Sequence, residues 1–147
     1  MENTTDSDGS LEKLRDLMKD INFCMLTTLD DGCLRSRPMS TNSEVEANGD
    51  LWFFLYASSH KVSEVDRHHQ VNVSFYDREK QCYVYLSGTA ELVRDPAKIR
   101  ELWQPELKAW FPKELDEPDI ALLKVTAAKA EYWDAPDSWV PKTVGFI

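Results

Sequence analysis

A run of seven residues, LWFFLYA at 51–57, has an apolar side chain at nearly every position. A strand with one face in water alternates polar and apolar residues, so this run predicts a strand that is covered on both faces. The sheet that contains it must therefore curl around it or receive a second layer. The chain of 147 residues can supply that cover within one domain, because 42% of its residues are hydrophobic and 11% are aromatic.

Most of the other strand-like runs are joined by short turns. DDG at 30–32 is a hairpin signal and NGD at 48–50 is a second turn, whereas the connections 58–69 and 95–119 are long and have helical character. The expected strands lie at 22–29, 33–40, 51–57, 70–77 and 82–93, with one or two more within 120–134.

These elements favour a closed or partly closed antiparallel barrel with peripheral helices, because closure removes exposed sheet edges. Two residues mark irregular points in its strands. Pro38 lacks an N–H donor and predicts an edge strand or a bulge, and Gly88 predicts a bend or a bulge.

The two ends of the chain have less regular patterns. Residues 1–10, MENTTDSDGS, are polar and acidic, which does not suit a targeting signal, and we expect a flexible leader there. A single domain is expected at 11–147. Ser10 can cap a helix whose apolar residues follow helical spacing, and the residues after Asp134 are expected to form an irregular tail.

Charge and cysteine content narrow the class of protein. The formal net charge of −9 disfavours a nucleic-acid partner, since phosphate contacts need clustered lysine and arginine. No apolar run approaches the ~20 residues of a membrane span, so we expect no membrane partner. Cys24, Cys33 and Cys82 lie at wide spacings in apolar or strand-like runs, which predicts free buried thiols, no metal site and a cytoplasmic protein.

The apolar run is followed at once by SSHK at 58–61, where a helix begins. The first turn of a helix presents unpaired N–H groups and the positive end of the helix dipole, so hydroxyls and an ammonium placed there predict an anion cradle suited to a phosphate ester. Arg37, on a neighbouring strand, would add a second cation. In a simpler interpretation a serine only caps the helix, and Lys61 and Arg37 are solvated.

Five tryptophans are a second feature with a possible functional meaning. Trp103 and Trp133 lie just before residues that should end regular structure, Pro105 in one case and Asp134 with Pro136 in the other. A flat ring at such a point can contact a planar ligand or pack against a second subunit. Spacing alone does not separate these two uses.

Several segments carry a family resemblance. They are RPMS (37–40), LWFFLYASSHK (51–61), LSG (86–88), LWQPELKAWFP (102–112) and ALLKVTAAKAEYWD (121–134). In this order they resemble the pyridoxamine 5′-phosphate oxidase-like split barrels, most closely the general stress protein 26 branch. The resemblance implies a mostly β (α+β) fold, namely a six-stranded antiparallel split β-barrel with peripheral helices. It also implies a homodimer that holds FMN in clefts between its subunits.

The resemblance further implies which residues hold the cofactor. Arg37, Ser59 and Lys61 match the residues that hold the FMN phosphate, with Ser58 as a helper. FAD is the alternative cofactor, and no catalytic residue follows from the match. The positions expected along the flavin are the backbone of Pro38, Met39, Ser40, Phe54, Leu55 and Tyr56, and the aromatic positions, which touch flavin or pack the dimer, are Trp103, Trp110 and Trp133.

Two departures from the family bear on function. His60 stands where the oxidases commonly have arginine, and the C-terminal SWVPKTVGFI does not match the segment with which they hold pyridoxal phosphate. We therefore expect an FMN-binding flavoprotein acting as an NAD(P)H-linked oxidoreductase, without pyridoxamine phosphate oxidase activity. The alternatives are a non-catalytic flavin-binding or flavin-buffering stress protein, and a barrel that binds no flavin. A deazaflavin or a haem is disfavoured, the haem because no histidine lies in an apolar run.

Overall fold

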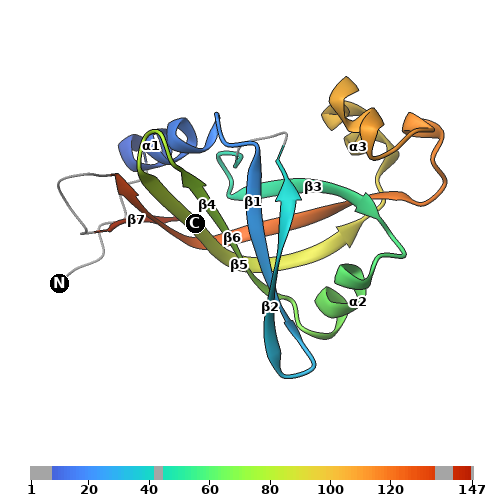
Figure 1. Ribbon diagram of the computed structural model, residues 1–147, viewed down its shortest axis with the longest axis horizontal. Helices are drawn as coiled ribbons and strands as arrows, with labels where there is room; N and C mark the ends of the chain where they lie inside the picture. Colours follow the sequence, from blue (N-terminus) through green and yellow to red (C-terminus); the bar gives the residue numbers. More distant parts are fainter. Residues whose placement is uncertain (1–7, 42–44, 135–140, 147) are drawn as a thin grey trace.

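The computed structural model describes residues 8–41, 45–134 and 141–146 (Figure 1). The strands are β1 (Phe23–Asp30), β2 (Cys33–Ser40), β3 (Asp50–Tyr56), β4 (Gln70–Asp77), β5 (Cys82–Val93), β6 (Ile120–Asp134) and β7 (Lys142–Gly145). The helices are α1 (Asp8–Met18), α2 (His60–Arg67) and α3 (Pro96–Leu102), with 3-10 turns η1 (Pro105–Ala109) and η2 (Glu114–Asp116).

The strands form one antiparallel sheet in the order β2-β1-β4-β5-β6-β3, and β7 pairs with β6 outside this order. The sheet does not close, because β2 and β3 are its two ends. The expected antiparallel split barrel with peripheral helices is therefore confirmed. Helix α1 packs against β5 and β7, α2 packs against β1 and β5, and α3 with its two 3-10 turns stands at one end of the sheet (Figure 1).

Both faces of β3 are covered, as the unbroken apolar run predicts. Leu51 and Phe53 are fully buried in the main core of the barrel. Trp52 points the other way and is buried in a second cluster with Ile99 of α3 and Leu107 of η1. The long connection 95–119 thus provides the second layer that an end strand with two apolar faces requires.

Two predicted irregular points are also confirmed. Pro38 lies in β2, an end strand of the sheet, where its missing N–H costs no ladder bond on the open side. A register shift between Ser87 and Gly88 forms a bulge in β5, and a Cβ at Gly88 would lie 2.0 Å from the Thr126 carbonyl oxygen. Only glycine fits this close approach of two strands.

The two chain ends differ from the expectation. Residues 1–7 of the expected leader lie outside the described residues, and Asp8, Gly9 and Ser10 belong to α1. The expected irregular tail is wrong for 142–145, which form β7 and give the sheet a seventh strand. The reason is that β6 runs as one strand of 15 residues and extends past the end of β3, so its edge at 129–132 is free for β7 to pair.

The cysteines differ in burial. Cys24 and Cys82 are buried, and burial raises the pKa of the Cys24 thiol to about 12. Cys33 is exposed, contrary to the expectation, because it follows the two-residue turn at the tip of the β1–β2 hairpin. No helix among the described residues is long and apolar enough to cross a membrane.

Candidate functional site

The open edges of the split barrel border a cavity of about 370 Å³, which we call the edge-strand cavity. Its lining includes both backbone segments that the resemblance assigned to the cofactor, together with Ser59 and Lys61. The 105–111 segment closes its remaining side. Its lining residues are Pro38, Met39 and Ser40 of β2, Phe54, Leu55 and Tyr56 of β3, Ser59 and Lys61 at the start of α2, Phe23, and Leu107, Trp110 and Phe111.

One end of this cavity carries polar groups that lack partners. Ser59 precedes α2 with an extended backbone, yet its side chain makes no capping bond, and its buried Oγ has no hydrogen-bond partner among the described residues. Within the described parts of the chain, no carboxylate lies at salt-bridge distance from the Lys61 ammonium. Burial lowers the pKa of Lys61, and the nearby charge of Arg37 lowers it further.

Arg37 lies behind this end of the cavity and does not line it. Its side chain is only 12% exposed, and its hydrogen bonds to described residues all come from one nitrogen, Nη2. This nitrogen lies 2.8 Å from Thr28 Oγ1, 3.0 Å from each carboxylate oxygen of Glu64 and 3.5 Å from the Arg35 carbonyl oxygen. Nε and Nη1 are buried and have no hydrogen-bond partner among the described residues. Burial lowers the pKa of Arg37, and the Glu64 carboxylate opposes this effect.

Glu64 holds the Arg37 guanidinium in place, and the sequence did not predict this role for Glu64. The carboxylate is 2% exposed and also accepts bonds from Thr28 at 3.3 Å and from Arg35 at 3.5 Å. A glutamate on a short helix is ordinarily solvated, so nothing in the local pattern distinguishes it. Burial of the carboxylate follows from the packing of α2 against β1, which carries Thr28.

Asp30, His60 and Glu64 bring ligand-type atoms within 4.8 Å of one another. His60 Nε2 lies 3.6 Å from Asp30 and 3.9 Å from Glu64. Arg35 contacts the same two carboxylates, at 3.9 Å and 3.5 Å. The arginines therefore supply the positive charge that these carboxylates require, so the cluster serves as a junction between the β1–β2 hairpin and α2 rather than as a metal site.

The chain matches the model of a known protein family. The family model described as pyridoxamine 5′-phosphate oxidase like matches residues 9–147. The chain belongs to this family. The family resemblance stated from the sequence is thus confirmed.

Solved structures of general stress proteins are among those that share this fold. A protein related to general stress protein 26 from Clostridium acetobutylicum is 21% identical, with a TM-score of 0.79 over 95% of this chain and 96% of the other. A general stress FMN/FAD binding protein from Xanthomonas citri is 25% identical, with a TM-score of 0.72 over 88% and 94%. Protein bli-3 of Neurospora crassa is 29% identical over 135 residues, which are 85% of this chain but only 65% of that protein's length.

Ser58, which the family resemblance suggested as a helper in holding the phosphate, does not line the edge-strand cavity. Its Oγ donates to Asp119 Oδ2 at 2.6 Å and its N–H donates to the same oxygen at 3.2 Å, and these bonds lower the pKa of Asp119. Ser58 therefore joins the loop after β3 to the start of β6. Its hydroxyl is occupied, unlike that of Ser59.

The aromatic positions of the oxidase-like motif separate into three environments. Trp103 lies behind the cavity wall, with its ring centroid 5.8 Å from that of Phe54 in an edge-to-face contact. Trp110 lines the cavity, is 55% exposed, and its carbonyl accepts the Tyr56 hydroxyl at 2.7 Å. Trp133 does not reach this cavity and lies on the outer face of β5 and β6.

Trp133 belongs to a hollow of about 470 Å³ on the outer side of the sheet, where exposed and half-buried apolar side chains form a set. We call this set the aromatic face. Tyr76 and Tyr83 stack there at 4.6 Å, and the Tyr85 hydroxyl, held by Glu131, has its pKa raised by burial to about 12. Its members are Phe23, Met25, Tyr76, Tyr83, Tyr85 and Trp133.

Proposed function

We propose that this chain binds FMN in the edge-strand cavity and acts as a flavin-dependent oxidoreductase. The observation that carries the proposal is that Ser59 Oγ, which has no hydrogen-bond partner among the described residues, and Lys61 line one end of a mostly apolar cavity, with the unpaired Nε and Nη1 of Arg37 buried behind that end. Buried donors without acceptors each cost about 1–3 kcal/mol, so their clustering points to an anionic ligand that supplies the acceptors. The description of the Xanthomonas relative as binding FMN/FAD supports the same assignment.

The residues present fit a flavin with a terminal phosphate. Ser59 and Lys61 would hold the phosphate at the N-terminal end of α2, where the helix dipole favours an anion, and Arg37 would add charge from behind. The apolar walls and the end strands β2 and β3 would hold the ring, because end strands leave part of their backbone polar groups unpaired. When bound, the flavin would supply electron-transfer chemistry.

The first experiment is a titration of the flavin-free chain with FMN, riboflavin and FAD, followed by flavin fluorescence. We expect FMN to bind most tightly, since riboflavin lacks the phosphate and FAD carries a diester in its place. The visible spectrum of the freshly purified protein gives a second measurement. A colourless protein that also takes up no FMN would contradict the proposal.

We also propose that the chain forms a homodimer through the aromatic face. The support is that large exposed apolar side chains gather there, and Phe23 and Pro38 border both this face and the edge-strand cavity. A second subunit on this face would therefore adjoin the flavin. Dilution should then release flavin together with dissociation, and a flavin-retaining monomer would argue against this arrangement.

A non-catalytic flavin-binding protein is the second candidate. The observation in its favour is that Tyr56 and Lys61 are the only titratable groups lining the edge-strand cavity in the described part of the chain. Tyr56 is held by the Trp110 carbonyl, and burial raises its pKa, so neither group is an obvious acid or base near neutral pH. Anaerobic bleaching of bound FMN by NADH or NADPH would favour the oxidoreductase, and no bleaching by either would favour the binding protein.

A further inference from the structure

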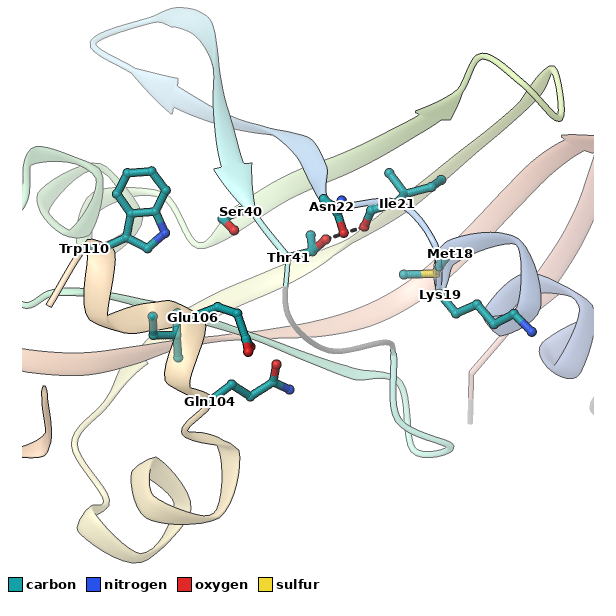
Figure 2. Close-up of a pocket in the computed structure, with 10 residues that line it drawn as sticks. Met18, Lys19, Ile21, Asn22, Ser40, Thr41, Gln104, Glu106 and Trp110 are labelled. Atoms are coloured by element: carbon teal, nitrogen blue, oxygen red, sulfur yellow. Dashed lines mark hydrogen bonds between the residues drawn. The ribbon is translucent and has the colours of Figure 1, made fainter.

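A second cavity, of about 610 Å³, lies between the end of α1, the end of β2 and the η1 segment (Figure 2). We call it the α1–η1 cavity. Part of its wall is apolar, formed by Met18, Ile21 and Leu107, and Trp110 stands at the border with the edge-strand cavity. In Figure 2, the side chains of Gln104 and Glu106 lie on the η1 side, across from Asn22 and Thr41.

The two cavities adjoin at the end away from Ser59 and Lys61. Ser40, Leu107 and Trp110 line both, whereas Ser59 and Lys61 line only the edge-strand cavity. A molecule in the α1–η1 cavity would therefore approach a flavin from the side opposite its phosphate.

Backbone and side-chain bonds hold the walls of the α1–η1 cavity in place. Thr41 donates its N–H to the Asn22 carbonyl at 2.8 Å and its hydroxyl to the Ile21 carbonyl at 2.6 Å (Figure 2). On the other side, the Tyr56 hydroxyl holds the Trp110 carbonyl at 2.7 Å. A preformed cavity with fixed walls is typical of a small-molecule site.

The charges around this cavity exclude one class of ligand. Lys19 is the only cation among its described lining residues, and its Nζ lies 2.9 Å from Asp16 Oδ1. Glu106 contributes a carboxylate, and the other polar lining groups are neutral amides and hydroxyls. A nucleotide phosphate needs unneutralised cations, and the described lining residues offer none. An uncharged ligand meets no such penalty.

We propose that the α1–η1 cavity binds an uncharged planar molecule of the quinone class. Its ring would lie against the exposed face of Trp110, and its carbonyl oxygens would accept bonds from Asn22 and Ser40. Binding of this molecule requires only the α1–η1 cavity. The role of this molecule as a redox partner rests on the proposed flavin site.

The test uses duroquinone as the probe, because its fully methylated ring does not add thiols such as the exposed Cys33. Binding to the full chain is measured by calorimetry without flavin, and FMN binding is measured separately. Asn22→Trp fills the cavity without touching the edge-strand cavity, and Leu115→Trp, on the exposed η2 turn, is the matched control. Asn22→Trp should weaken duroquinone binding by about tenfold or more and leave FMN binding unchanged.

A gain of binding complements this loss, because misfolding cannot produce it. Glu106→Lys should tighten binding of anthraquinone-2-sulfonate, an anionic planar probe, by about fivefold. Unchanged duroquinone binding in Asn22→Trp would overturn the site. NADPH that binds more tightly than duroquinone and is lost in Asn22→Trp would overturn the ligand class. A chain that takes duroquinone in this cavity but no FMN would support the site while refuting the proposed flavin function.

Discussion

At the residue scale, Arg37 shows how a buried side chain can be held by one nitrogen and still keep donors that have no partner in the described part of the chain. Glu64 and Thr28 both contact Nη2, and this leaves Nε and Nη1 without partners among the described residues. The Glu64 carboxylate offsets the cost of burying the guanidinium charge. The buried Nε and Nη1 donors of Arg37 cost free energy as long as no anion accepts their hydrogen bonds.

Replacing Lys61 tests the predicted phosphate contact directly. Lys61→Ala should weaken FMN binding by about 1.5–3 kcal/mol if the ammonium makes a charge-assisted bond to the phosphate. Riboflavin binding should change little, since riboflavin has no phosphate. Lys108→Ala, on the exposed side of η1, is the matched control. Equal FMN affinity in both variants would remove Lys61 from the site.

The lowered pKa of Lys61 gives a pH dependence. Burial and the charge of Arg37 bring this pKa below its ordinary value of 10.5, so the charged form is disfavoured in the flavin-free protein. A bound phosphate favours the charged form and raises the pKa again. FMN affinity should therefore fall as pH rises through the lowered pKa, and the ratio of FMN to riboflavin affinity measures this. A ratio that stays constant up to 10.5 would contradict the assignment.

Glu64 should act on the flavin through Arg37. Glu64→Gln removes the charge that fixes the guanidinium, so we expect FMN affinity to fall by about tenfold while riboflavin affinity is unchanged. Loss of both affinities would indicate general unfolding instead. Glu12→Gln, exposed on α1, is the control. Fluorescence titration with the two flavins measures the difference.

At the element scale, the site depends on two end strands that do not pair with each other. β2 pairs only with β1 and β3 only with β6 in the described sheet, so the gap between them becomes the edge-strand cavity. The η1 segment closes this gap because Leu107 and Phe111 pack against the outward face of β3. The second layer that covers β3 thus also forms the wall of the cavity.

The bulge in β5 offers a test of sheet geometry. A methyl group at Gly88 would collide with the Thr126 carbonyl oxygen, which is backbone and cannot move aside. We expect Gly88→Ala to lower the free energy of unfolding by about 3 kcal/mol. Gly32→Asn is the control, since Gly32 has open space around it and asparagine tolerates its positive φ. Urea unfolding that shows equal losses would contradict the close packing.

At the scale of the whole molecule, the exposed side chains are unevenly distributed. Phe23, Met25, Tyr76 and Tyr83 are large apolar residues that lie together on the aromatic face. An exposed apolar patch of this kind marks an interaction surface more often than a solvated one. A second copy of the chain is the partner we propose for it.

A charge placed on this face should separate the proposed subunits. Tyr76→Lys replaces one ring of the stacked pair with an ammonium, so we expect the dimer to weaken by about 2 kcal/mol or more and FMN to dissociate with it. Leu115→Lys changes an exposed apolar residue away from this face and is the control. Sedimentation over a range of concentrations measures the association. A wild-type chain that sediments as a monomer throughout would contradict the dimer.

The sequence by itself determined six of the seven strands, the turn at 30–32, the covered strand at 51–57 and most of the residues that line the edge-strand cavity, because side-chain alternation, turn residues and a family motif are local signals. Tertiary structure alone decided that Glu64 holds Arg37, that Ser58 binds Asp119, and that β7 extends the sheet. Each of these depends on which strands become neighbours and in what register. Local patterns do not encode that choice, since it is made by the packing of the whole sheet.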